Sequence, residues 1–473
     1  MKKIVTAFLC ALLLSALPVL AAQPDAAPAA ANETPDWPLL GKQAFEQGKY
    51  EAAAEHFNRA VAIAKTPVDM ATALFGKVSM LTLLQRNEEA IAVYDEVVKR
   101  YGNAPEAALR KRVAWALFGK GVTLARLQRS EETIATFNEM VKRYSDAPEA
   151  ALREQAAKAM FVKGGLLMQW QRSEEAITVF SEVVNRYGDA PEAALRELVA
   201  QAMFVKGGTL IQLQRNEEAI ATYDTMVKRY GDVPEAALRG LVAQALASKG
   251  ATFSRSQRSE EAIAVFNEVV KRYGDVPEAA LRGRVAEALV YKGLALNQLQ
   301  RSEEAITVFN EVMKRYGDAP EAVLREWVAE ALLNKGATLG QLQRSEEAIA
   351  VYNEVVKRYG DAPEAALRSW VAGALLNKGV ALGQLQRSEE EIAIYDEVVN
   401  RYGDAPEAAT REHVAKAMGN KGFRLAQLQR SEEAIAVYDE VVKRYDGATE
   451  AGTSGAVARV LILKNLLQRD KPD

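Results

Sequence analysis

Apolar residues recur at steps of three and four along most of the chain, which is the spacing of one face of an α-helix. The segment from Ser345 to Tyr359 shows this spacing at Ala348, Ile349, Tyr352, Val355, Val356 and Tyr359. The segment before it, from Leu324 to Leu342, keeps the same spacing over a longer stretch. The pattern therefore predicts long helices that alternate with shorter ones.

This alternation has a period of 43 residues. Each period contains a short motif of Gln-Arg, then Ser or Asn, then Glu-Glu, and the motif begins at Gln85, Gln128, Gln171, Gln214, Gln257, Gln300, Gln343, Gln386 and Gln429. A fixed period of this length is typical of a solenoid, in which each unit buries its apolar face against its neighbours. Such a stack favours binding along a wall over catalysis in an enclosed chamber.

Local chemistry predicts where the helices begin and end. Ser345 is expected to be the N-cap of the shorter helix, with the two following glutamates at the positive end of the helix dipole. Gly360 is expected to end that helix in the left-handed conformation. The next long helix is expected to have Asp361 as its cap and Pro363 in its first turn.

One glycine interrupts each long helix, at Gly121, Gly164, Gly207, Gly250, Gly293, Gly336, Gly379 and Gly422. A glycine inside a helix costs about 1 kcal/mol relative to alanine. Because it returns at one register, we expect a neighbouring helix to pack too closely there for a Cβ atom.

One unit breaks the pattern of the shorter helix. Small residues stand at the register of Ala348 in the other units, whereas Glu391 stands there in one of them. A carboxylate buried without a partner costs several kcal/mol or must take up a proton. If Glu391 is buried in this way, we expect the chain to open early near this residue.

A motif of glycine, a small residue and an aromatic residue recurs in every unit, as in Gly336, Ala348 and Tyr352. The N-terminal segment carries a fuller version of it, at Trp37, Leu40, Gly41, Tyr50, Ala53, Phe57 and Ala60. These residues resemble the signature of the tetratricopeptide repeat, over roughly residues 37–445, although the period exceeds the usual 34 residues. The resemblance implies an all-α, right-handed solenoid of antiparallel helix pairs.

The N-terminus has the features of a secretory signal. Lys2 and Lys3 precede an apolar stretch, and small residues follow Pro18 up to Ala22. This pattern predicts a signal peptide over residues 1–22, cleaved after Ala21 or Ala22, with no stable membrane insertion afterwards. The alternative is that the uncleaved segment anchors the protein in the inner membrane.

The rest of the chain divides by composition and period. We expect a flexible linker rich in alanine and proline at residues 23–36, because such a composition does not form a packed core. An N-terminal repeat unit is expected at 37–66 and nine units of the 43-residue period at 67–447. Residues 448–473 are expected to form a capping helix and a tail.

Composition argues against several functional classes. The chain has 60 Lys and Arg, 63 Asp and Glu, two His and one Cys, with a net charge of −3. A mildly acidic protein is expected to bind nucleic acid poorly. His56 and His413 belong to distant units, and Cys10 lies in the expected signal peptide, so neither a nucleophilic triad nor a zinc site is expected. We expect no enzymatic activity, no metal and no cofactor.

The resemblance also implies where a ligand would bind. In tetratricopeptide proteins the first helices line a concave face, and residues around the repeated glycine contact a peptide. The residues that match these positions, apolar in the N-terminal half and asparagine in the C-terminal half, are Phe118, Phe161, Phe204, Val162, Val205, Met168, Ile211, Asn334, Asn377 and Asn420. The alternative is that the apolar residues fill the core and the asparagines bond neighbouring turns or water.

Together these features predict an exported scaffold or adaptor that binds a protein or peptide on the concave face of the solenoid. The expected location is the periplasm of a Gram-negative bacterium. The alternative function is binding of peptidoglycan fragments, which would use aromatic platforms. The candidates for such platforms are spread thinly along the chain, at Trp115, Trp170, Trp327 and Trp370.

Overall fold

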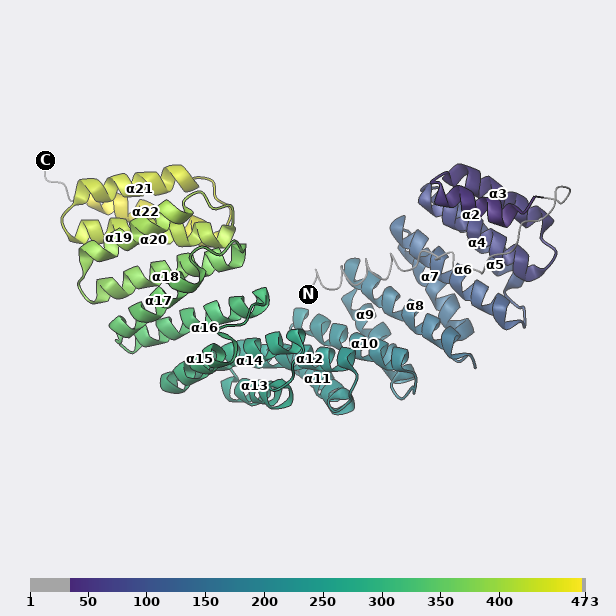
Figure 1. Ribbon diagram of the computed structural model, residues 1–473, viewed down its shortest axis with the longest axis horizontal. Helices are drawn as coiled ribbons and strands as arrows, with labels where there is room; N and C mark the ends of the chain where they lie inside the picture. Colours follow the sequence, from purple (N-terminus) through teal and green to yellow (C-terminus); the bar gives the residue numbers. More distant parts are fainter. Residues whose placement is uncertain (1–34, 470–473) are drawn as a thin grey trace. The chain divides into compact units, whose positions relative to one another are not determined.

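The computed structural model describes residues 35–469, which form helices joined by short turns (Figure 1). Within this range every regular element is an α-helix, so the expected all-α fold is confirmed. The expected signal peptide at residues 1–22 lies outside the described residues, as do nearly all of the expected linker and the last four residues of the tail.

Long and short helices alternate along the described chain. It begins with α2 (Trp37–Glu46) and α3 (Tyr50–Ile63). The long helices that follow are α4 (Pro67–Leu83), α6 (Ala107–Arg126), α8 (Ala150–Gln169), α10 (Ala193–Gln212), α12 (Ala236–Arg255), α14 (Ala279–Gln298), α16 (Ala322–Gln341), α18 (Ala365–Gln384), α20 (Ala408–Gln427) and α22 (Ala451–Arg469). The short helices are α5 (Asn87–Tyr101), α7 (Ser130–Tyr144), α9 (Ser173–Tyr187), α11 (Asn216–Tyr230), α13 (Ser259–Tyr273), α15 (Ser302–Tyr316), α17 (Ser345–Tyr359), α19 (Ser388–Tyr402) and α21 (Ser431–Tyr445).

The helices of the described residues belong to two compact units, one that ends at Leu241 and one that begins at Val242, with the boundary inside α12. Within each unit, each helix packs against the next one along the chain as an antiparallel pair (Figure 1). The long helices of successive pairs also pack directly against one another, as α6 does on α8 and α16 on α18. Each unit is therefore an α-solenoid in which the long helices form a continuous layer.

The repeated glycine lies where the short helix of the same pair crosses the long one. A Cβ atom on Gly336 would lie 2.5 Å from Cε1 of Tyr352, whose side chain is buried. The other seven glycines of this register face a Phe or Tyr of their own pair in the same way. The expected close approach of a neighbouring helix is therefore confirmed, and an aromatic ring makes it.

The glutamine of the junction motif ends each long helix. All nine glutamines have a φ between 58° and 62°, in the left-handed region. Around Gln343, the N–H of Gln343 donates to the carbonyl of Gly340 at 3.1 Å, and the N–H of Arg344 donates to Leu339 at 2.9 Å. This is the hydrogen-bond pattern of the Schellman motif, which satisfies the last carbonyls of a helix.

The predicted N-cap of the short helix is wrong by one residue. Helix α17 begins at Ser345, and Arg344 occupies the N-cap position, because Gln343 has just ended the long helix. The Ser345 hydroxyl instead donates to Oε1 of Gln384 in the next pair, at 2.7 Å. The serine therefore joins two neighbouring pairs.

The junction arginine and its two glutamates also connect the pairs. Nε of Arg344 lies 2.6 Å from Oε1 of Glu347 in its own helix. Nη1 of the same arginine lies 3.0 Å from Glu303, at the start of the preceding short helix. The two glutamates of the motif thus have different partners: the first binds the arginine of the next pair and the second binds its own.

The predicted left-handed glycine at the end of the short helix is also wrong. Gly360 has φ −55° and ψ −36°, which is ordinary helical backbone. A Cβ atom on Gly360 would lie 3.5 Å from Nη1 of Arg401 in the next pair. At the equivalent place one pair earlier, Nη1 of Arg358 donates to the carbonyl of Gly317 at 3.0 Å. The end of the short helix therefore accepts a guanidinium group from the next pair.

The long helix begins later than predicted. Helix α18 begins at Ala365, so Asp361 is not its cap and Pro363 lies outside its first turn. The N-cap is Glu364, whose Oε1 lies 2.5 Å from Nη1 of Arg325 in the preceding pair. The start of the helix is thus placed by an ion pair between neighbours.

Glu391 is buried, but it has a partner, so the condition for the expected weak joint is not met. Its side chain is 5% exposed, and Nε of Arg424 donates to its Oε2 at 2.5 Å. The Tyr395 hydroxyl donates to Oε1 at 3.2 Å. Burial raises the pKa of Glu391, and the bonds to Arg424 and Tyr395 oppose that rise. The unit therefore replaces a small-residue joint by a buried ion pair.

The left-handed glutamines give a testable prediction. Gln343 is exposed, and its conformation costs an L-residue about 1 kcal/mol that glycine does not incur. We expect Gln343→Gly to stabilise the chain slightly and Gln343→Val to destabilise it by about 1–2 kcal/mol. Urea unfolding followed by circular dichroism, with hydrogen exchange of α16 and α17, measures both. As a control, Gln341→Gly places the same substitution at a helical position and should destabilise.

The pair of Glu391 and Arg424 gives a second prediction. We expect Arg424→Ala to destabilise α19 and α20 by about 3–5 kcal/mol, because it leaves a buried carboxylate without a partner. The double variant Glu391→Ala and Arg424→Ala, which restores the residues found one pair earlier at Ala348 and Ala381, should recover most of this loss. Hydrogen exchange of the two helices measures it. A double variant as unstable as Arg424→Ala would contradict the pairing.

Candidate binding face of the long helices

Side chains that differ from repeat to repeat gather on the long helices. At the register of Trp327, the neighbouring long helices carry Arg284, Trp370 and His413. These four side chains are half-buried, so they are accessible at the surface of the layer. The residues that are copied from repeat to repeat, such as the glycines, junction arginines and glutamates, make the joints instead. The varied face is therefore the candidate site.

In the first unit, the predicted phenylalanines pack against the aromatic ring of the short helix. The ring centroids lie 5.9 Å apart for Phe118 and Phe137, and 5.7 Å apart for Phe161 and Phe180. Phe204 contacts Tyr223 in the same way, at 6.2 Å. These rings fill space within the helix pairs, and their contact with a ligand stays a prediction.

The aliphatic candidates of the first unit also have partners in the fold. Val162 is buried in the core and Val205 is half-buried. Sδ of Met168 accepts a hydrogen bond from the Thr209 hydroxyl at 3.3 Å, and Ile211 packs against a buried cluster that includes Leu210. Of these four residues, Met168 thus connects α8 to α10. A role in ligand contact stays a prediction for them as well.

The three asparagines of the second unit are half-buried and bonded within the protein. Nδ2 of Asn334 donates to the carbonyl of Glu330 at 2.9 Å, one turn earlier in the same helix. Asn377 and Asn420 are hydrogen-bonded to the hydroxyls of Tyr352 and Tyr395, respectively. An amide can make up to four hydrogen bonds, so each asparagine keeps capacity for a ligand.

Helices α14 and α16 bring together an aromatic and acidic patch that the sequence analysis did not identify. The rings of Tyr291 and Trp327 meet edge to face at 6.0 Å. Glu287 is paired with Arg284, with Nη1 and Oε2 2.7 Å apart. Burial, together with the charge of Glu287, raises the pKa of Glu330 to about 7. A carboxyl group of this kind can donate a hydrogen bond when protonated and attract a cation when ionised.

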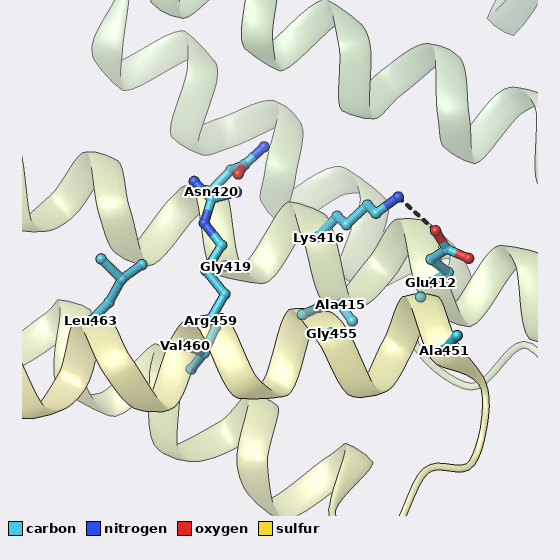
Figure 2. Close-up of a pocket in the computed structure, with 12 residues that line it drawn as sticks. Glu412, Ala415, Lys416, Gly419, Asn420, Ala451, Gly455, Arg459, Val460 and Leu463 are labelled. Atoms are coloured by element: carbon cyan, nitrogen blue, oxygen red, sulfur yellow. Dashed lines mark hydrogen bonds and ion pairs between the residues drawn. The ribbon is translucent and has the colours of Figure 1, made fainter.

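A cavity of about 300 Å³ lies between α20 and α22 (Figure 2). Asn420, Lys416 and Arg459 line it, and Nζ of Lys416 lies 2.6 Å from Oε1 of Glu412. The cavity is open because Gly455 and Ala456 of α22 stand where α20 carries Glu412 and His413. That loss of bulk was visible in the sequence as a change of residue type at one register.

The described residues show neither a metal site nor a membrane span. No group of three or more His, Cys, Asp or Glu side chains in residues 35–469 is arranged to hold a metal ion. His56 stacks on Trp37 in the first unit, with ring centroids 5.5 Å apart, whereas His413 packs over Gly373 in the second. In the same range, the helices are too short or too polar to cross a bilayer.

The sequence matches models of a known repeat family. One tetratricopeptide repeat model matches residues 39–105, 205–277 and 248–320, and a second matches residues 329–361. The chain is a tetratricopeptide repeat protein. Its fold is typical of proteins that act as interaction scaffolds without catalysis. No curated protein sequence gives a significant match.

Several solved structures are similar to this tetratricopeptide protein. The apo form of RapI has 10% identity and a TM-score of 0.45, and the alignment covers 85% of this chain and 100% of that one. A tetratricopeptide repeat protein from Parabacteroides merdae has 12% identity and a TM-score of 0.38, with 65% and 99% coverage. MamA from Desulfovibrio magneticus, from residue 41 to its end, has 21% identity and a TM-score of 0.32, with 44% and 97% coverage.

The aromatic and acidic patch gives a pH-dependent prediction. Because folding raises the pKa of Glu330 from 4.5 to about 7, the folded chain holds this proton more tightly than the unfolded chain. The stability of α16 should therefore fall as pH rises from about 4.5 through 7. A carboxyl ¹³C titration should place Glu330 near 7. Glu287→Gln should lower that midpoint, and Glu326→Gln, on the same helix, should not.

Proposed function

We propose that this protein is an exported scaffold that binds another polypeptide along the face of its long helices. The proposal rests on one observation: the repeated residues and the varied residues occupy different places in the fold. The repeated side chains make the joints, whereas side chains that vary, such as Trp327 and Glu330, are held half-buried on the continuous layer of long helices in the second unit. A half-buried surface whose side chains vary from repeat to repeat is suited to specific recognition.

The chemistry of this face suits a polypeptide. Tyr291 and Trp327 offer large aromatic surface with little conformational entropy to lose. Asn334, Asn377 and Asn420 add amide groups on three successive long helices, one in each of α16, α18 and α20. Amides at such spacing can bond the backbone of an extended chain that crosses several helices. The same face offers neither a nucleophile with its base nor a metal site within the described residues, so we propose a non-catalytic role.

The export part of the proposal rests on the N-terminal sequence. Lys2 and Lys3, the apolar stretch after them and the small residues at Ala21 and Ala22 are typical of a signal for secretion. We propose that the mature chain acts in the periplasm of a Gram-negative bacterium. The alternative, peptidoglycan binding, would use aromatic platforms, and Tyr291 with Trp327 offers one such pair of rings on this face.

Position-specific photocrosslinking tests the proposal. A benzoylphenylalanine residue replaces Trp327 on the long-helix face, or Lys357, which is exposed on the short helix α17. In cells, we expect one defined polypeptide to be crosslinked from position 327 and at least about tenfold less from position 357. The recovered protein should begin at Ala22 or Gln23 if the signal is cleaved.

Two results would contradict this function. Equal crosslinking from both positions would show that contact is nonspecific. Absence of any polypeptide adduct from position 327, together with pelleting of the protein by purified peptidoglycan, would favour the alternative. A matched variant, Trp327→Ala, should weaken capture of the same polypeptide without changing the circular dichroism spectrum.

A further inference from the structure

The last helix of the described chain is a long helix without a short helix packed on its outer side. Helix α22 contacts α20 and α21 through one face, where Thr453 and Val460 are buried. Its opposite face is exposed and includes Leu461 at 41%, Ile462 at 62% and Leu466 at 52%. Leu461 and Ile462 have their equivalents two repeats earlier in Leu375 and Leu376. Those two residues are only 1% and 7% exposed. The outer face of α22 thus keeps the apolar character of a joint.

The apolar surface also extends beyond α22. Leu466 stands at the register of Phe423 in α20 and Val380 in α18, and both of these side chains are exposed. A contiguous exposed apolar patch on a soluble protein marks an interaction site.

Successive long helices are joined by arginine–glutamate pairs, and α22 does not carry the arginine for a further pair. In the preceding joints, the arginine of a long helix pairs with the N-cap glutamate of the next, as Arg411 does with Glu450. The residue of α22 at the register of Arg411 is Ser454. The outer face therefore lacks the cation that would select another repeat, so its partner is expected to offer an uncharged, largely apolar surface.

The outer face of α22 is complementary in side-chain size to the same face of a second copy related by a two-fold axis. Its N-terminal half carries the short exposed residues Ser454 and Ala458, and its C-terminal half carries the large residues Ile462 and Leu466. In an antiparallel pair, the small half of one helix lies opposite the large half of the other. Arg459, a charged residue at the edge of this face, extends toward Asn420 across the cavity (Figure 2). No acidic residue occurs in α22.

We propose that this protein forms a two-fold dimer through α22, with the outer faces of the two α22 helices packed antiparallel. Ala458 of one copy then lies opposite Ile462 of the second. A two-fold contact closes on itself, so the assembly stops at two chains. The interface is small for a stable dimer, so we expect a dissociation constant on the order of 10 µM. The proposal does not depend on the proposed polypeptide ligand, which would bind the long-helix face.

Sedimentation velocity of the full chain across 1–200 µM, a range set by the expected affinity of about 10 µM, tests the dimer. We expect a reversible shift from monomer to dimer. Ile462→Glu should weaken dimerisation by at least about 100-fold, because it buries an unpaired charge. Leu342→Glu, a matched substitution of an exposed apolar residue at another helix end, should leave it unchanged. Circular dichroism confirms folding, since Ile462 is exposed in the monomer.

Mixing two variants tests the antiparallel register. Ala458→Lys and Ile462→Glu should each be monomeric alone, and a mixture of the two should dimerise, because lysine 458 of one chain then faces glutamate 462 of the other. A monomer at every concentration, larger open-ended species, or a dimer insensitive to Ile462→Glu would overturn the proposal. Dimerisation of the wild type without rescue in the mixture would overturn the antiparallel arrangement.

Discussion

Each helix pair depends on the close approach of its long helix to its short helix at one glycine. The ring of Tyr352 occupies the space where a Cβ atom on Gly336 would lie. An aromatic ring of the short helix lies over the equivalent glycine in the other pairs as well. The contact lets a large aromatic residue be buried between two backbones, so its apolar surface is removed from water without pushing the helices apart. That gain outweighs the roughly 1 kcal/mol by which glycine weakens the helix.

Pairs are then joined to one another by a second kind of interaction, in which arginines reach across to the neighbouring pair. Arg344 contacts Glu303, and Arg325 contacts Glu364. A single exposed ion pair contributes little, typically less than about 1 kcal/mol. Here the ion pairs also lie at the starts of helices, because Arg344 and Glu364 are N-cap residues. The Gln-Arg-Ser-Glu-Glu motif is therefore a connector, with the left-handed glutamine ending one helix so that the arginine can begin the next.

The features that depend on one helix pair could be predicted from the sequence, whereas those that depend on the neighbouring pair could not. The bounds of the short helix and the crowding at Gly336 follow from periodicity and residue size within one unit. Ser345 and Gly360 were assigned the usual roles of their residue types, but their surroundings include Gln384 and Arg401 of the next pair. Glu391 likewise has its partner 33 positions later. In the candidate site, the positions of the asparagines in the repeat could be predicted from the sequence. The contact between Tyr291 and Trp327 could not, because it depends on how α14 packs on α16.

This separation between joint and surface constrains where new binding properties can arise. A substitution at a joint register changes contacts on two helices at once, as at Glu391, which is buried against Arg424 of the next pair. A substitution at the register of Trp327 or Glu330 changes one half-buried side chain and leaves the glycine and arginine contacts intact. The same reasoning applies to α22, where the joint on the outer side is absent from the described chain. Its outer registers lack the arginine found in the preceding joints, and they carry short and aliphatic residues in an order that matches its own two-fold image.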